Sequence, residues 1–262
     1  MPHPALRNVV RSFGERRATL DSRVVAFPLT ARPHQIIDIY LGDPLSIRVD
    51  GGDFETAPEM AIVGPQGSRR IHVYASGRLH IFNILLQPAA LHQLFGLDMT
   101  EFIGKGIPAR DALGKHAVEL DSAVRSAPDF AARVAAAERW FGKMLDRSRP
   151  EDGIADASRR LLTARGNVRI SALAGQSGLS DRQFQRRFAR QVGLPPKLYA
   201  RTTRFDAALT EHRFRPEKSW TRIIHEAGYF DQAHFIRECH ALVGLPPSAF
   251  IGDWHNIFMP DV

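Results

Sequence analysis

The chain has 262 residues, of which 44 % are hydrophobic, and it carries a formal net charge of +7. This length predicts two domains, because a single domain usually spans about 100–200 residues. No stretch approaches the roughly 20 apolar residues that a membrane-spanning helix needs, and the arginine-bearing first twenty residues lack the apolar core of a secretory signal. The single cysteine, Cys239, excludes an internal disulfide and a cysteine-rich zinc site. We therefore expect a cytoplasmic protein without a membrane partner.

The positive charge is concentrated in the C-terminal part of the chain. Residues 155–262 contain 16 Lys and Arg against 10 Asp and Glu, a net charge of +6, whereas residues 1–154 contain 19 against 18. A basic domain joined to a nearly neutral one suggests a polyanionic partner for the basic part. A merely soluble basic surface would give the same charge, so charge alone does not decide.

Short apolar runs broken by turn residues occupy the region from about residue 20 to residue 88. The runs lie at 24–29, 36–41, 45–49, 60–63, 71–74 and 79–86, and clusters rich in Gly, Pro and Asp separate them. Short runs at this spacing predict an antiparallel β sandwich or barrel. The runs at 36–40 and 80–86 are too apolar for exposed edges and should be central strands.

A helical period replaces the strand pattern after residue 88. Residues 89–94 form a short candidate helix, and apolar residues recur at helical spacing over 113–124 and 130–145. The last of these helices could pack on the β region or pair with its copy in a second chain. The charged stretch that follows, broken by Pro150 and Gly153, predicts a linker at 148–154 between domains at 1–147 and 155–262.

The C-terminal domain contains a repeat of about 51 residues. The sequence Gly-Leu-Pro-Pro at 193–196 recurs at 244–247, with a phenylalanine nine residues before each copy, at Phe184 and Phe235. Each copy predicts a helix, a tight turn with a glycine (Gly178 or Gly228) and a second helix. The first copy gives helices at 171–176 and 181–191, and the second gives helices at 220–227 and 232–242. This all-α arrangement is that of two helix-turn-helix units.

The second helix of the first unit presents a cationic face. Its predicted outward residues are Arg182, Gln185, Arg186, Arg187, Arg190 and Gln191. Arginine can form two hydrogen bonds with guanine and glutamine can do the same with adenine. Residues 197–212 predict a linker helix that would place the two recognition helices in successive major grooves of double-stranded DNA, about 34 Å apart.

At these residues the chain resembles the AraC/XylS family of bacterial transcription regulators. The strongest likeness is at 227–237 and 244–250, and the first unit fits as well. The resemblance implies base contacts from the first turns of both recognition helices, and our predicted DNA-binding residues are Arg182, Gln185, Arg186, Arg190, Gln232, Ala233, His234, Ile236 and Arg237. Of these, Ala233 and Ile236 can offer only apolar contact, for example to a thymine methyl, and His234 would contact a phosphate or cap the fold.

The second unit departs from the family pattern. Glu238 and Cys239 stand where members often carry a basic and an aromatic residue. The lower basicity predicts that the second unit grips DNA more weakly than the first. Cys239 aligns with Phe188 on the inward face and is expected in the core rather than as a redox sensor.

The N-terminal domain resembles, more loosely, the cupin-like sensor domains that precede this DNA-binding domain. The likeness lies at 63–66 and 86–96. In the family such domains bind a small effector, dimerise, or do both, and an activator would also contact RNA polymerase. The resemblance therefore implies a ligand-responsive regulator, whose effector residues the sequence does not identify, with a domain that serves only for dimerisation as the alternative.

A metal-dependent cupin enzyme fused to a DNA-binding module is a third hypothesis. Its candidate ligands would be His34, His72, His80, His92 and His116. The closely spaced histidines and following glutamate of a cupin metal cluster are missing, and phosphate loops and nucleophile elbows are also missing. We therefore expect no catalytic residues, no metal and no cofactor.

Overall fold

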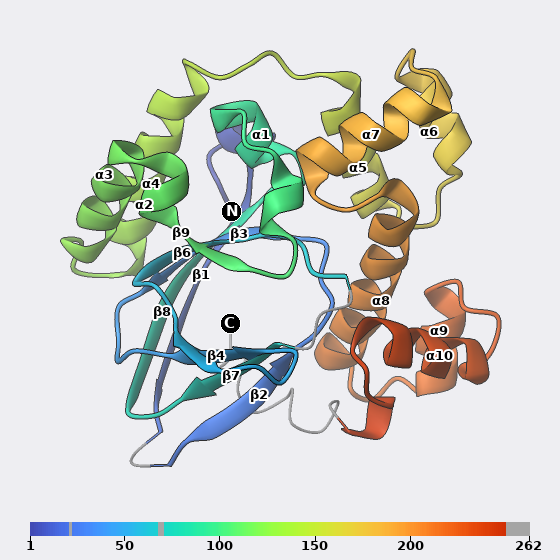
Figure 1. Cartoon of the computed structure of the whole chain (residues 1–262), viewed down its shortest axis with the longest axis horizontal. Helices are drawn as coiled ribbons and strands as arrows, with labels where there is room; N and C mark the ends of the chain where they lie inside the picture. The colour runs from blue at the N-terminus through green and yellow to red at the C-terminus, as the bar shows by residue number, and fades with distance from the viewer. Residues whose placement is uncertain (21–22, 68–70, 250–262) are drawn as a thin grey trace.

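A computed structural model describes residues 1–20, 23–67 and 71–249. Residues 250–262 of the predicted DNA-binding domain lie outside this described part. The chain folds into an N-terminal β domain with flanking helices and a C-terminal helical domain (Figure 1).

Two antiparallel sheets form the N-terminal domain. The strands are β1 (Val10–Thr19), β2 (Val25–Leu29), β3 (Gln35–Tyr40), β4 (Ser46–Val49), β5 (Phe54–Thr56), β6 (Met60–Val63), β7 (Ile71–Ala75), β8 (Arg78–Leu86) and β9 (Gly106–Pro108). One sheet has the order β1-β8-β3-β6-β9 and the other the order β2-β7-β4-β5. The predicted mostly-β architecture is confirmed, and β3 and β8 are central in the first sheet as expected.

The β region begins ten residues earlier than the sequence predicts. Strand β1 pairs with β8 from Val10 opposite Leu86 to Thr19 opposite Arg78. Its central residues Glu15, Arg16 and Arg17 are charged, so it lacks the apolar run that marked the other strands.

The larger sheet buries both of its faces. Successive side chains of a strand point to opposite sides. Ile37, Ile39, Phe82 and Ile84 pack in one core with the helices, whereas their neighbours on β3 and β8 face the space between the two sheets. Near-continuous apolar runs are expected from strands that are covered on both sides.

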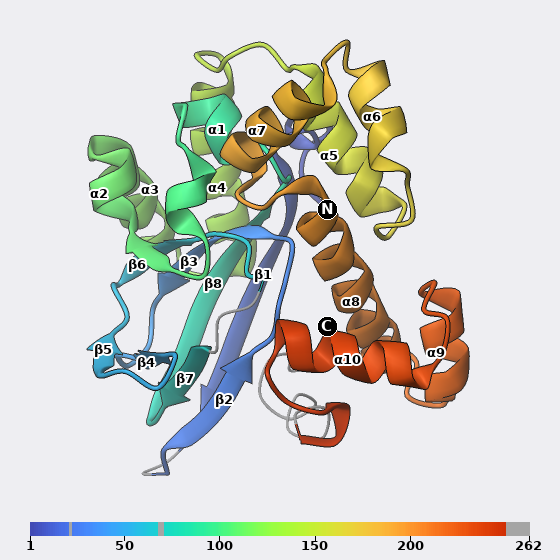
Figure 2. The ribbon, with the colours of Figure 1, turned by 45° about the vertical axis from the view of Figure 1, so that its right-hand side comes forward.

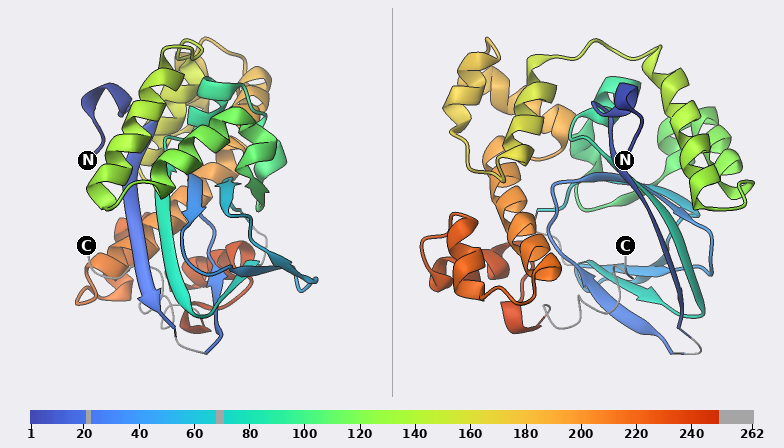
Figure 3. Two further views of the ribbon diagram at one scale, coloured as in Figure 1. Left: turned by 90° about the vertical axis from the view of Figure 1, so that its left-hand side faces the viewer. Right: turned by 180° about the vertical axis from the view of Figure 1, so that it is seen from behind.

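Helices cover the outer face of the larger sheet (Figure 3). They are α1 (Ala90–Phe95), α2 (Ala109–Leu113), α3 (Lys115–Arg125) and α4 (Phe130–Leu145). Of the two alternatives for the predicted helix at 130–145, packing on the β domain is realised, since Ala137, Phe141 and Met144 are buried in this core.

An ion pair ties α4 to β1 inside this contact. Arg133 Nη1 donates to Glu15 Oε1 over 2.8 Å, and His80 Nε2 lies 2.9 Å from the same oxygen. Burial alone raises the pKa of Glu15, but the hydrogen bond to His80 and the charges of Arg133 and Arg17 outweigh it and hold that pKa below its ordinary value.

The C-terminal domain consists of two helical cores joined by a long helix. Its helices are α5 (Gly153–Thr163), α6 (Ile170–Gln176), α7 (Asp181–Val192), α8 (Pro196–Phe214), α9 (Trp220–Glu226) and α10 (Gln232–Leu242). One core joins α5, α6, α7 and the start of α8, and the other joins the end of α8 with α9 and α10. Figure 2 shows α8 running between the two units. The predicted linker at 148–154 overlaps α5, which begins at Gly153 because the Asp152 side chain caps it.

No helix in the described part of the chain is both long and apolar enough to cross a membrane.

The Arg133–Glu15 pair yields a stability prediction. Arg133→Ala should lower the free energy of unfolding by roughly 3 kcal/mol, because it leaves a buried carboxylate with less compensation. Arg139→Ala removes an exposed arginine from the same helix and should change it by less than about 0.5 kcal/mol. Urea unfolding of both variants measures the difference, and equal values would contradict a structural role for the pair.

The same pair makes stability depend on pH. Because the folded-state pKa of Glu15 is lowered, its contribution is fully present above the unfolded-state value of 4.5 and is lost as pH falls through the lower folded-state value. The free energy of unfolding, measured with urea, should therefore fall more steeply below about pH 4.5 for the wild type than for Glu15→Gln.

Candidate DNA interface and ligand cavity

Local signals in the sequence fix the first recognition helix, α7. The Ser180 side chain accepts from Gln183 N, and the Gln183 side chain accepts from Ser180 N, so the two residues form a capping box. Gly178 before it has a φ of +65°, which glycine adopts without strain. Phe184 and Phe188 are fully buried and lie 5.6 Å apart between ring centroids. The opposite face of the helix is thereby turned to solvent.

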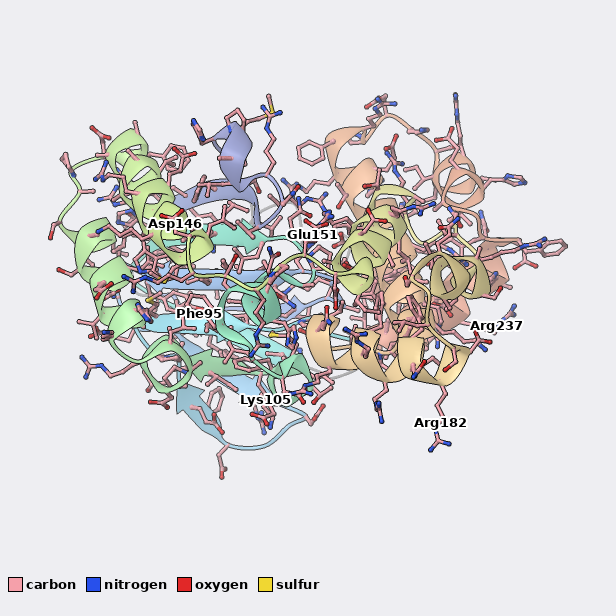
Figure 4. All side chains as sticks on the ribbon, turned by 90° about the horizontal axis from the view of Figure 1, so that it is seen from above. Phe95, Lys105, Asp146, Glu151, Arg182 and Arg237 are labelled. Atoms are coloured by element: carbon pink, nitrogen blue, oxygen red, sulfur yellow. The ribbon has the colours of Figure 1, made fainter. Side chains whose placement is uncertain are left out.

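Three of the predicted DNA-binding residues share this solvent-facing side. Arg182, Gln185 and Arg186 are exposed, and within the described part of the chain none of them makes a hydrogen bond or an ion pair. Arg182 projects away from the ribbon in Figure 4. The first two turns of α7 therefore present side-chain donors for which the described residues provide no acceptor.

The C-terminal end of α7 faces the rest of the protein. Arg190 lies 3.6 Å from Asp98 in the N-terminal domain, so this predicted DNA contact sits at the domain interface. Arg187 donates to Asp152 over 3.0 Å. Gln191, expected on the outward face, is buried and donates to Asp152 over 2.7 Å. The outward prediction for Gln191 is therefore wrong, because the Asp152 carboxylate that caps α5 draws this side chain inward.

The second recognition helix, α10, is capped by Asp231, whose side chain accepts from His234 N. The side chains of Gln232, Ala233, Ile236 and Arg237 are exposed on it, and Arg237 is labelled in Figure 4. Gln232 donates to Thr221 of α9 over 3.1 Å. The second unit thus presents fewer unpaired donors than the first.

His234 is a half-buried residue in the first turn of α10. Its Nδ1 lies 3.4 Å from Phe230 N, and its ring meets that of Tyr229 edge-on at 5.2 Å. The structure therefore places it as a cap within the unit.

Glu238 faces helix α8, and Cys239 faces the core of the second unit. Glu238 accepts from Arg201 of α8 over 3.1 Å. Its negative charge is compensated there, which removes one reason for expecting a weaker second unit. Cys239 is fully buried in the second core, and burial raises the pKa of its thiol to about 12. It stays protonated at neutral pH, as a core residue should.

A cavity of about 480 Å³ lies between the two sheets of the N-terminal domain. The apolar side chains of β3, β4, β7 and β8 form most of its wall, including Ile36, Ile47, Val73 and Ile81. Cavities of this size commonly hold a small organic ligand. Sequence reasoning did not find these residues, because the face that a strand residue occupies depends on the pairing of the sheet.

Two arginines, Arg16 and Arg32, line this cavity together with Asp38, Tyr40 and Asn83. The pKa of Arg16 is lowered to about 10, mainly by burial; the charge of Asp38 opposes this shift and the charge of Arg32 adds to it. Arg16 stays protonated at neutral pH all the same. Asn83 donates a hydrogen bond to Asp38.

The histidines considered as metal ligands lie apart. His34 pairs with Asp206, His80 with Glu15, and His92 Nδ1 lies 2.8 Å from Leu97 O. Within the described residues no group of three or more His, Cys, Asp or Glu side chains could hold a metal ion.

Comparison with known proteins bears on both domains. Residues 173–252 match the model of a helix-turn-helix domain family. Solved structures of ToxT from Vibrio cholerae share the fold. One superposes with a TM-score of 0.52 at 9 % identity, covering 94 % of this chain and all of that one. A fatty-acid-bound form gives 0.50 at 11 % identity, covering 92 % and 95 %. No curated protein sequence matches the chain.

The class of the C-terminal domain follows from these findings. Residues 173–252 match a helix-turn-helix domain family, and the chain shares the two-domain fold of ToxT. The C-terminal domain is therefore of a class that binds DNA.

Arg186 yields the first prediction for this interface. Arg186→Ala should weaken binding to a specific site by roughly 1–3 kcal/mol, because an arginine can form two hydrogen bonds with a guanine. Arg237→Ala should cost less. Arg110→Ala removes the same charge from an exposed position on α2 and serves as the control. Fluorescence anisotropy with a labelled operator measures all three, and equal losses for Arg186→Ala and Arg110→Ala would contradict a base contact.

Proposed function

We propose that this chain regulates transcription by placing α7 and α10 in successive major grooves of one operator, under the control of a small molecule bound in the N-terminal cavity. One observation carries the proposal: a single chain joins an exposed cationic recognition helix to a domain with a mostly apolar cavity of about 480 Å³. Such cavities are the common sites for small ligands.

The base-reading residues are divided between the two helices. In α7, Arg182 and Arg186 would read guanine and Gln185 adenine, since these residues are exposed and unpaired among the described residues. In α10, Gln232 and Arg237 would supply hydrogen bonds, and Ala233 and Ile236 would contact a thymine methyl. The division into domains at 1–147 and 155–262 belongs to the same proposal.

The effector proposal draws support from ToxT. Solved structures describe that protein bound to an unsaturated fatty acid and to (E)-4-(8-methylnaphthalen-1-yl)but-3-enoic acid. The identity to this chain is only 9–11 % in those structures, so the likeness supports the fold, and the cavity of this chain has to carry the ligand argument by itself.

A homodimer and, for an activator, contact with RNA polymerase complete the proposal, in the cytoplasm where DNA is accessible. The dimer has one observation in its favour, since Val118 of α3 and Phe130 of α4 are large apolar side chains with exposed fractions of 44 % and 40 %. A purely dimerising N-terminal domain is the alternative to effector control. Regulators of this type are generally not enzymes.

Selection from a randomised DNA pool tests the DNA-binding half of the proposal. The full chain should enrich a motif of two blocks centred about 10 base pairs apart, because two successive major grooves lie one helical turn apart. Arg186→Ala should relax one block only. Binding that merely follows salt concentration, with no enriched motif, would show a non-specific polyanion binder instead.

A filled cavity tests the effector half. Ala61 of β6 is buried and lines the cavity, so Ala61→Phe should occupy part of the ligand space. In a thermal-unfolding screen of metabolites, at least one compound should stabilise the wild type and the matched control Ala61→Val but not Ala61→Phe. A compound present at 100 times its Kd should contribute about 2.7 kcal/mol. If every stabilising compound raised the thermal stability of all three proteins equally, the cavity would not be the binding site of these compounds.

A further inference from the structure

The charged groups of the cavity wall fall into two sets. Asp50, Glu55 and Lys105 are exposed and belong to the rim, and Figure 4 labels Lys105. Arg16, Arg32 and Asp38 are close enough to one another for their charges to interact. We call Arg16, Arg32, Asp38, Tyr40 and Asn83 the arginine pole.

The arginine pole has an excess of positive charge. Two guanidinium groups face one carboxylate, and that carboxylate already accepts a hydrogen bond from Asn83. The Nε atom of Arg32 is buried and has no hydrogen-bond partner among the described residues. A third guanidinium, that of Arg213 in α8, lies near enough to lower the pKa of Arg16 and is itself partly offset by Asp206. Buried charge of one sign is costly unless a counter-charge joins it.

The rest of the described cavity wall restricts the ligand further. Apolar side chains predominate, and no Ser, Thr, Gln, Phe or Trp side chain is among the described lining residues. A sugar or another polyol would leave most of its hydroxyl groups unpaired against such a wall. A carboxylate on an apolar body suits both parts, because an arginine fork matches a carboxylate with two parallel hydrogen bonds.

Arg32 also lies within a short segment that contacts the second helix-turn-helix unit, the linker helix α8 and the end of α7. Ala31 is fully buried in the core of the second helix-turn-helix unit. His34 Nε2 lies 3.2 Å from Asp206 of α8. Gln35 Nε2 donates over 3.3 Å to each of the last carbonyls of α7, those of Gln191 and Val192.

The backbone of Arg32 connects this segment to a second contact with α8. Arg32 and Gln66 exchange two backbone hydrogen bonds of 2.9 Å. Gly67 follows Gln66 and lies so close to Leu198 of α8 that an added Cβ would come within 3.0 Å of that side chain. A shift of Arg32 toward a ligand would therefore change two sets of contacts with the DNA-binding domain: those of residues 31–35 and that of Gly67 with α8.

We propose that the effector is an organic anion with an apolar body, that Arg32 and Arg16 bind its anionic group, and that residues 31–35 transmit this binding to both helix-turn-helix units. The inference rests on the proposed effector function and names the ligand class and the route of control. Because coupling between two sites is reciprocal, operator DNA must change the affinity for the anion by the same factor by which the anion changes the affinity for DNA.

Three eight-carbon probes test the ligand class on the full chain. Octanoate, octanamide and octylammonium share a tail and differ in head charge. Calorimetry should show octanoate bound at least tenfold more tightly than the other two, because only its head group can form charge-assisted hydrogen bonds with the arginines. Arg32→Met should abolish this preference, and Lys105→Met, which removes a rim cation instead, should retain it. Equal affinities for the three probes, no octanoate binding, or equal effects of the two variants would overturn the anion assignment.

A histidine variant tests the transmission. His34→Leu removes the contact with Asp206, and His72→Leu on β7 changes a half-buried histidine outside the segment. His34→Leu should bind octanoate within about twofold of the wild type, yet octanoate should no longer alter its operator affinity. His72→Leu should behave as the wild type. An unchanged octanoate effect in His34→Leu would overturn the route.

Different outcomes distinguish a wrong ligand class from the absence of effector control. If octanoate does not bind but another compound from the metabolite screen alters operator binding through the cavity, the ligand class is wrong and effector control stands. If no compound alters operator binding, effector control itself is wrong.

Discussion

Burial of both faces of the larger sheet is the constraint on which the N-terminal domain depends. Alternate residues of a strand point to opposite sides. The side chains of β3 and β8 must therefore pack against the helices on one side of the sheet and line a ligand-sized cavity on the other. Phe82 belongs to the helix-facing core while its neighbours Ile81 and Asn83 line the cavity. The cavity wall is therefore backed by a packed core and cannot close by simple collapse.

This constraint also explains which strands the sequence predicted. Strands β3 and β8 are apolar on both faces, so they appear as continuous runs. Strand β1 carries Glu15 and Arg16 on opposite faces, and although Glu15 also pairs with the exposed Arg17, its buried partner lies far away in the sequence. Glu15 meets Arg133 from a helix 118 residues later, whereas Arg16 faces the cavity. Only the tertiary structure shows that a charge on a strand is balanced by a residue far away in the sequence. From sequence alone, a charged strand such as β1 is therefore mistaken for a loop.

The recognition helices were predictable because their determinants are local. A cap at Ser180, a positive-φ glycine at Gly178 and the spacing of Phe184 and Phe188 all lie within eleven residues. The periodicity failed at Gln191, where the deciding partner is Asp152, in the segment before α5. The cavity arginines could not be found, since neither the register of β1 nor the return of the 31–35 segment to the DNA-binding domain is encoded in nearby residues.

The position of the interdomain contacts limits how control can operate. The N-terminal domain holds α7 by its C-terminal end, through Gln35 and through Asp98 opposite Arg190. The first turns of α7, with Arg182 and Arg186, remain exposed. Covering of the recognition surface is therefore not the means of control that this arrangement offers, and what it constrains is the orientation of one unit relative to the other. Each of these contacts, a hydrogen bond and an ion pair, is worth about 1 kcal/mol or less, and allosteric couplings typically amount to 1–3 kcal/mol. A ligand that changes one or two such contacts is therefore sufficient to redirect α7 relative to α10, provided that it binds the two arrangements with different affinity.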